Sequence, residues 1–266
     1  MLRFRSAGAS HRGLVRDGNE DSGFAGPYLQ LVADGVGGAA AGEVASATAA
    51  YVVTALHLAD PAADVLELLA RAVESVHEQL RAGAAADAAR SGMGTTLTTL
   101  LTDGARVALG HVGDSRAYRS RDKELTRLSH DHTFVQTLVD GGAITAEEAR
   151  RHPQKNLVLE VLTGERPSRP DLVLVDLVEG DRVLLCSDGL TDLVEDDRIA
   201  ARLAATTDPE AAVDALVDDA LAAGGVDNVT CLVADVVEGP RLQPDGSWLG
   251  AFADPYLVVD PAAVRS

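Results

Sequence analysis

Four aspartates stand at loop junctions beside glycine or asparagine, three of them where an apolar strand ends. They are Asp34, Asp114, Asp188 and Asp227. Carboxylates delivered together to the edge of an apolar core repel one another, and their pKa values rise unless a cation neutralises them. Oxygen ligands alone favour hard cations such as Mg²⁺ or Mn²⁺. A single Asp-Gly pair is typical of an ordinary turn, so the four predict a metal site only if they meet in space.

A shorter string near the N-terminus combines a cation with two more carboxylates. It runs from Arg16 to the pair Glu20 and Asp21. The guanidinium of Arg16 offers a two-pronged donor that suits phosphate. Taken alone, the string is typical of a solvated surface turn. Gly35, directly after Asp34, would let a backbone carbonyl approach a metal closely.

Composition excludes several other kinds of protein. The 266 residues include 23 lysines and arginines against 41 aspartates and glutamates, a net charge of −18. So acidic a chain is a poor binder of nucleic acid or of an anionic membrane surface. There is no apolar run long enough to span a bilayer and no apolar signal core at the N-terminus. We therefore expect a cytoplasmic protein, acting as a monomer, without a membrane or nucleic-acid partner.

The elements that would position these residues follow an α+β order. Turn signals and apolar periodicity predict helices over 42–58, 62–82, 196–205 and 209–222, and two short helices within 132–151. Strands are predicted over 1–10, 28–34, 94–102, 105–112, 115–121, 124–128, 171–178, 181–187 and 228–237. The four strands between 94 and 128 indicate an antiparallel meander, and 83–90 indicates a loop. Thr145 and Glu148 have the spacing of a capping box.

Strand periodicity also bears on the two cysteines. Cys186 shares a strand face with Asp188, and Cys231 shares one with Asp227. If the aspartates point inward, both thiols are buried and chemically inert.

Together, six strings in order give the chain a family resemblance. They are Arg16-x-x-Asn19-Glu20-Asp21, Asp34-Gly-x-Gly-Gly38, Gly92-Met-Gly-Thr-Thr96, Gly113-Asp114-Ser-Arg116, Ser187-Asp188-Gly189 and Asp227-Asn228-Val-Thr230. This order resembles the PPM-type (type 2C) metal-dependent protein serine/threonine phosphatases, and their bacterial branch most. The match covers about residues 6–238. It implies a four-layer αββα sandwich of two antiparallel sheets flanked by helices. We therefore expect a phosphatase domain over 1–239 and an extended tail over 240–266.

The resemblance also implies a role for each matching residue. It makes Asp34 the carboxylate that bridges two metals and Gly35 a carbonyl ligand, with Asp188 and Asp227 as further ligands. Glu20 and Asp21 match residues that hold metal-bound waters, Asn228 matches a residue beside the site, and Asp114 matches a ligand of a third, weaker metal. Arg16 matches the phosphate-binding arginine. Arg16, Asp34 and Asp188 are thus the expected catalytic residues, with two Mn²⁺ or Mg²⁺ ions as cofactors.

The implied reaction is hydrolysis of phosphoserine or phosphothreonine by a hydroxide that bridges the two metals. Substrates would be phosphorylated proteins, the products of a serine/threonine kinase. Two positions depart from the family pattern. Val36 stands where eukaryotic members have a histidine proposed as general acid, and Asn156 stands where bacterial relatives often have a serine ligand of the third metal. Two other functions stay open: an inactive phosphatase-like sensor or scaffold, and a phosphatase of nucleotides or other small phosphomonoesters.

Overall fold

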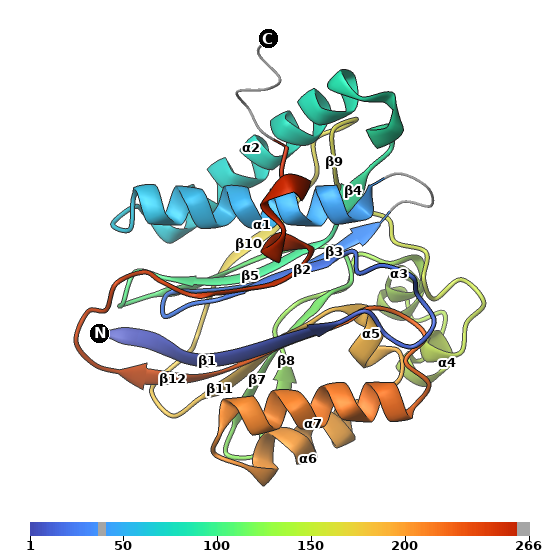
Figure 1. The fold of residues 1–266 in the computed structure, drawn as a ribbon. Helices are drawn as coiled ribbons and strands as arrows, with labels where there is room; N and C mark the ends of the chain where they lie inside the picture. Colours follow the sequence, from blue (N-terminus) through green and yellow to red (C-terminus); the bar gives the residue numbers. More distant parts are fainter. Residues whose placement is uncertain (37–40, 260–266) are drawn as a thin grey trace.

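The computed structural model describes residues 1–36 and 41–259 (Figure 1). Positions 37 and 38 of the glycine-rich string lie outside the described residues, as do the last seven residues of the expected tail, 260–266. Two antiparallel β-sheets pack face to face, and helices cover both outer faces (Figure 1). The four-layer sandwich that the resemblance implied is confirmed.

Within the described residues, one sheet has five strands and the other has eight. The five-stranded sheet has the order β1 (Leu2–His11), β12 (Val229–Glu238), β11 (Arg182–Cys186), β7 (Arg116–Arg121), β8 (Glu124–Arg127). The larger sheet has the order β10 (Asp171–Val175), β6 (Val107–Val112), β5 (Leu97–Thr102), β3 (Leu29–Val36), β2 (Asp21–Ala25), β13 (Ser247–Gly250). Two further short strands extend it beside β3: β4 (Gly94–Thr95) and β9 (Leu162–Thr163).

The helices fall into three groups. Those on the larger sheet are α1 (Gly42–Ala59) and α2 (Val65–Ala86), with the short turns η1 (Ala88–Arg90), η2 (Ala251–Ala253) and η3 (Pro255–Leu257) near them. Those on the smaller sheet are α5 (Asp188–Thr191), α6 (Asp196–Ala205) and α7 (Pro209–Ala222). The remaining two, α3 (Phe134–Asp140) and α4 (Ala146–Arg150), lie in the long connection between β8 and β9.

Three apolar layers hold the sandwich together. One fills the space between the larger sheet and its helices, with Leu68 and Val53 among its buried members. A second lies between the smaller sheet and its helices and includes Leu216. The third lies between the two sheets and includes Leu100 and Leu185. Aliphatic side chains and alanines supply nearly all of this burial, which is the dominant favourable term in folding.

Local signals explain where several helices begin. The side chain of Asp64 accepts hydrogen bonds from two amides of the first turn of α2, as an N-cap residue does. The side chain of Asp208 accepts one such hydrogen bond, from the amide of Glu210 in α7, and Pro209 occupies the first position of that helix. The capping box predicted at Thr145 and Glu148 is present at the start of α4.

Both thiols are buried and free, as predicted. Cys186 in β11 lies directly opposite Cys231 in β12, and neither side chain is exposed.

The predicted meander is wrong. β5 pairs with β6, and β7 pairs with β8, but β6 and β7 belong to different sheets. The chain crosses between the sheets at Gly113, which has a positive φ of 109°, and at Ser115, whose hydroxyl is buried against Thr96. Turn signals mark where strands end, but they do not show whether the next strand pairs or crosses. Strand β2 was not predicted, and α2 continues to residue 86 into the expected loop because its last residues are alanines.

The residues after Gly239 are not a free appendage as far as the structure describes them. β13 pairs with β2 along the edge of the larger sheet. Trp248 stacks on Phe252 with ring centroids 5.2 Å apart, and Phe252 and Val259 are buried in the layer beneath α1 and α2. Their apolar surface is the physical reason that this segment packs. A domain boundary at residue 239 stays a prediction.

Candidate active site

The ends of several strands meet at one edge of the sandwich, and the candidate residues lie there. Asp34 is near the end of β3 and faces Asp21, the first residue of β2, in the antiparallel register. Asp188 is the first residue of α5, two residues after the end of β11. Asp227 lies two residues before β12, and Asp114 lies in the crossing from β6 to β7. Residues distant in sequence are therefore brought together, as the metal-site hypothesis required.

The backbone of Asp34 is held by two neighbouring threonines. Its amide donates to the hydroxyl of Thr96 at 2.9 Å, and its carbonyl accepts from the Thr96 amide at 2.8 Å. The hydroxyl of Thr95 also donates to that carbonyl at 2.9 Å. These contacts give a purpose to the string Gly92-Met-Gly-Thr-Thr96, to which the sequence assigned no role: it fixes the strand that carries Asp34.

Asp21 is fully buried, and only one of its two carboxylate oxygens accepts a hydrogen bond among the described residues. Its Oδ2 accepts from the hydroxyl of Ser187 at 2.8 Å, and that hydroxyl in turn accepts from the amide of Thr230 at 3.0 Å. Its Oδ1 is buried and has no hydrogen-bond partner among the described residues. Burial raises the pKa of Asp21 to about 6, and the nearby charge of Asp227 adds to the shift. A buried carboxylate oxygen without a donor is costly unless something else pairs with it.

The other carboxylates repel one another. Burial, followed by the charges of Asp21 and Asp188, raises the pKa of Asp34 well above its usual range. The pKa of Asp188 is raised in the same way, by burial and then by the charge of Asp114. Burial also raises the pKa of Asp114 itself, to about 7. A shift in this direction across several neighbours marks a place where the fold gathers negative charge and does not offset it.

Arg16 lies against one of the candidate ligands. Its Nη2 donates to Oδ2 of Asp227 at 2.7 Å, and about half of the Arg16 side chain is exposed. Asn228 holds the surrounding loop in place, because its amide group donates to the carbonyls of Arg12 and Gly18, both at 2.9 Å. The side-chain oxygen of Asn228 accepts from the backbone amide of Glu20 at 2.7 Å. Asn228 thus positions the loop and does not point its own oxygen at the carboxylates.

Gly35 and Glu20 meet at the start of α1. The amide of Gly35 donates to the carbonyl of Glu20 at 3.1 Å, and a Cβ at position 35 would collide with the carbonyl of Gly42. Only glycine allows this close approach. The Glu20 carboxylate lies over Gly42, and its pKa is raised by burial and then by the charge of Glu43. Glu20 is therefore at the rim of the group of carboxylates.

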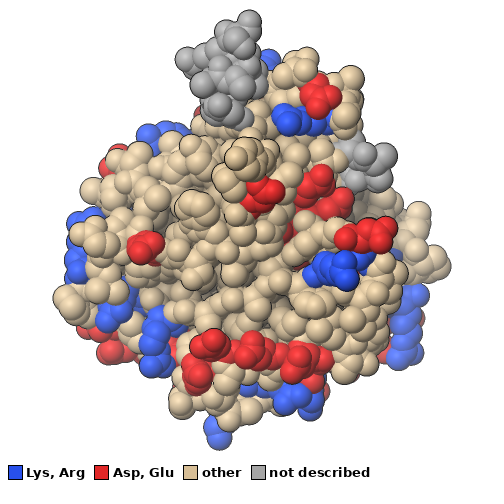
Figure 2. Space-filling view, viewed as in Figure 1, with Lys and Arg blue, Asp and Glu red and all other residues tan. Residues whose placement is uncertain are grey.

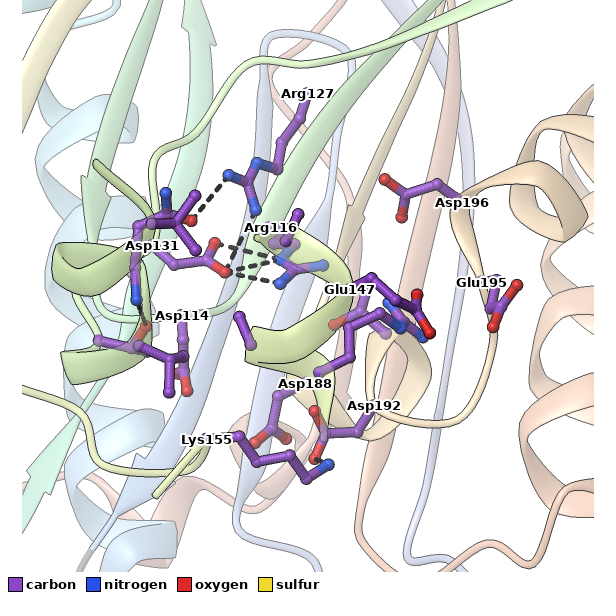
Figure 3. A pocket seen from close by; sticks show the side chains of 18 of the residues that line it. Asp114, Arg116, Arg127, Asp131, Glu147, Lys155, Asp188, Asp192, Glu195 and Asp196 are labelled. Carbon is purple, nitrogen blue, oxygen red and sulfur yellow. Dashed lines mark hydrogen bonds and ion pairs between the residues drawn. The ribbon is translucent and has the colours of Figure 1, made fainter. Parts of the chain in front are cut away.

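A cavity of about 520 Å³ opens beside Asp114 and Asp188. Its other walls are α3 and α4 on one side and the start of α6 on the other. Figure 3 shows Asp188 close to Asp192, whose carboxylate accepts from Lys155 Nζ at 2.6 Å. Asn156, the position that departs from the family pattern, also lines this cavity.

Arginine and aspartate side chains that form ion pairs with each other line one wall of the cavity. Arg116 binds Asp131 through Nε and Nη2, the shortest contact being 2.6 Å (Figure 3). Arg127 contacts Asp131 at 3.3 Å and donates to the side chain of Gln136 in α3 at 3.0 Å. This network connects the strand after Asp114 to the helical segment that covers the cavity.

The donor set fits hydrated divalent cations. The carboxylates provide oxygen atoms only, which suits Mg²⁺ and Mn²⁺, and the unpaired Oδ1 of Asp21 and the raised pKa values show that positive charge is missing. Across residues 1–36 and 41–259, no group of three or more aspartate, glutamate, histidine or cysteine side chains is arranged so that it could hold a metal ion by itself. Ions of this type keep several waters and need only one or two direct carboxylates.

Comparison with known proteins decides the family. The model of the protein phosphatase 2C family matches residues 19–223. The chain belongs to this family. It is 48% identical over 239 residues to the serine/threonine protein phosphatase PstP of Mycobacterium tuberculosis, covering 89% of this chain and 46% of that protein. The chain thus spans about half the length of the curated relatives at this identity.

Solved structures of the phosphatase 2C relatives have the same fold. A crystal structure of M. tuberculosis PstP matches with a TM-score of 0.84 at 46% identity, covering 89% of this chain and 100% of that one. A structure of the PstP catalytic domain in complex with two manganese ions matches with a TM-score of 0.80, also at 46% identity, covering 90% and 100%.

Sequence reasoning missed the carboxylate of Asp192, which lies beside these candidate residues. The charge of Asp192 contributes to the raised pKa values of both Asp188 and Asp114, so it belongs to the same group. It follows Asp188 by four residues, the spacing that places two side chains on one face of a helix. That four-residue spacing is the feature of the sequence from which Asp192 could have been predicted. Lys155 was missed because no pattern in the sequence connects it to Asp192.

Proposed function

We propose that this chain is a metal-dependent protein serine/threonine phosphatase whose catalytic domain comprises residues 1–239. The observation that carries the proposal is the group of buried carboxylates at the sandwich edge, where burial and the charges of neighbouring carboxylates raise the pKa of both Asp34 and Asp188. The phosphatase names of its relatives support the same activity. The manganese ions in the PstP structure support Mn²⁺ or Mg²⁺ as the cofactor, with two ions at the central site.

Each carboxylate has a place in this proposal. Asp34 would contact both ions, with the carbonyl of Gly35 beside it, and Asp188 and Asp227 would complete the ligands of one of them. Glu20 and Asp21 would accept hydrogen bonds from water around the ions, and Asp114 would hold a third ion more weakly. When bound, such a pair of ions makes water a nucleophile near neutral pH and offsets the charge of a phosphate.

Arg16 would bind the phosphate of the substrate. Its guanidinium is half exposed, and its contact with Asp227 places it beside the ligands of the metal site. Donors fixed at this position would stabilise the charge on the non-bridging phosphate oxygens as the bond to the leaving group breaks. Val36 has no proton to give, so the leaving alkoxide takes its proton from a group other than this side chain.

The segment 136–155 would select protein substrates. It contains most of α3 and all of α4, and it forms one wall of the cavity beside Asp188. Surface segments of this kind often determine specificity while a rigid core carries the chemistry. The physiological substrates would be phosphoproteins made by a serine/threonine kinase. None of the helices in the described residues is long and apolar enough to cross a membrane. A monomeric state and a cytoplasmic location are further parts of this proposal.

A substrate panel tests the proposal. The purified chain is incubated with a phosphothreonine peptide, a nucleotide monophosphate and a phosphodiester, each with Mn²⁺ and with a chelator. We expect Mn²⁺-dependent release of phosphate, fastest from the peptide. Faster release from the nucleotide would make the chain a small-molecule phosphatase. Peptide binding without any turnover would make it a phosphatase-like sensor or scaffold.

A further inference from the structure

Three aliphatic side chains are exposed at the sandwich edge, on the side of Arg16. Leu14 and Val15 are 65% and 67% exposed in the loop between β1 and β2, and Val226 is 52% exposed just before β12. The two loops touch, because the amide of Leu14 donates to the carbonyl of Gly225 at 2.7 Å. We call Leu14, Val15 and Val226 the apolar rim.

The apolar rim is built on a rigid base. Gly13 has a positive φ of 77°, and a Cβ there would collide with the carbonyl of Asp227. The side chain of Asn228 donates to the carbonyls of Arg12 and Gly18, which closes the loop on both sides of the rim. Because the backbone under these side chains is already held in place, covering them does not require the loop to be ordered as well.

The position of the rim indicates what covers it. Val15 precedes Arg16 in the chain and Val226 precedes Asp227, and these two charged residues are in contact at 2.7 Å. Because the rim residues adjoin Arg16 and Asp227 in the chain, a substrate residue next to a phosphate bound at Arg16 would lie near the rim. The guanidinium supplies charge complementarity to the phosphate, and the rim supplies an apolar contact for the residue next to it.

We propose that the apolar rim binds an aliphatic side chain adjacent to the phosphorylated residue of the substrate. This inference rests on the proposed function and narrows its substrate class to phosphoproteins with an aliphatic residue flanking the phosphoserine or phosphothreonine. Covering an aliphatic group in this way changes kcat/KM by roughly 10-fold, the discrimination that apolar contacts of this size provide.

Two matched peptides and two variants test the inference. The peptides share one phosphothreonine sequence and carry either leucine or serine at the positions flanking it. Wild type should prefer the leucine peptide by roughly 10-fold in kcat/KM, and the double variant Leu14→Ser, Val226→Ser should lose this preference. Val178→Ser is the control: Val178 is 45% exposed, close to the value for Val226, but it precedes β11 at the end far from Asp188. The control should keep the wild-type preference.

Other outcomes would overturn the inference. Equal rates of wild type on the two peptides, or an unchanged preference in the double variant, would remove the rim from substrate recognition. If p-nitrophenyl phosphate is turned over with Mn²⁺ in these same samples, the proposed function survives that result; absence of all turnover contradicts both. A dimer of the wild type in sedimentation, abolished by the double variant, would assign the rim to a second copy of the chain.

Discussion

On α7, the carboxylate of Asp219 is held by two arginines, whereas that of Asp34 at the sandwich edge has other carboxylates for neighbours. Asp219 accepts four hydrogen bonds of 2.6–2.9 Å from Arg198 and Arg202, and these bonds hold its pKa well below the usual range. The pKa of Asp34 is shifted the opposite way. In Figure 2, acidic side chains appear both as a row over α7 and near the end of β3.

The comparison separates carboxylates that arginines of the chain bind from carboxylates that lie beside other carboxylates. Burial by itself would raise the pKa of Asp181, but its hydrogen bonds with Arg121 and the Val178 amide, together with the charge of Arg121, lower it overall. A chain with 41 acidic residues and only 23 lysines and arginines has few cations to place. Arginines hold carboxylates such as Asp181 and Asp219 that join elements of the fold. We expect Asp34 and Asp188 at the sandwich edge to depend instead on cations from solution. Four predictions test this distinction.

The largest effect should come from comparing the same aspartate-to-asparagine substitution at the sandwich edge and on α7. Asp188→Asn removes a charged ligand from a site that depends on charge, and we expect Mn²⁺-dependent turnover of p-nitrophenyl phosphate to fall at least about 100-fold. Asp219→Asn should leave that turnover unchanged. Full activity in the Asp188 variant would show that the metal ligands are elsewhere.

Metal should stabilise the folded protein, and more so at high pH. The raised pKa values mean that the folded, metal-free protein binds more protons than the unfolded chain, so its stability falls as the pH rises from about 4 through about 7. Mn²⁺ at 100 times its Kd should add about 2.7 kcal/mol, and protons compete with it. We expect the Mn²⁺-induced rise in Tm to be larger at pH 8 than at pH 6; equal rises would refute the electrostatic argument.

Arg16→Ala tests one of the cationic side chains at the sandwich edge. Loss of a two-pronged phosphate contact should raise the KM for a phosphopeptide roughly 10-fold and lower kcat, with the Mn²⁺ requirement little changed. Arg12→Ala removes the same charge from the same loop and should have a much smaller effect. Similar kinetics of the two variants would mean that Arg16 does not contact phosphate.

The smallest effect is a change in stability from Asp219→Asn. Losing charged hydrogen bonds that are partly exposed should cost about 1 kcal/mol at pH 7. Because the folded-state pKa of Asp219 is lowered, its contribution is present above about pH 4 and is lost as the pH falls further. Urea unfolding should show a larger difference in stability between variant and wild type at pH 7 than at pH 3.

Most elements could be predicted because each has a local signal, whereas the sandwich was implied only by the family resemblance. The starts of α6 and α7 coincide with the prediction, and the six strings in order indicated the two-sheet architecture. The crossing at Gly113 and the packing of Phe252 could not be predicted, because both depend on contacts between distant segments. The same limit applies to the site: Asp192 has a spacing signal, but the contact of Arg16 with Asp227 joins residues 211 positions apart.

Cys186 in β11 and Cys231 in β12 provide a probe of unfolding, because both thiols are free and buried in the folded protein. Burial raises the pKa of Cys186 to about 12, and both sulfur atoms lie inside the smaller sheet's helix-covered layer. Only thiolate that reaches solvent reacts with an alkylating reagent, so labelling requires the strands to separate from α7. The labelling rate therefore reports how often this half of the sandwich opens, independently of catalysis, and a bound ion at the sandwich edge should slow it.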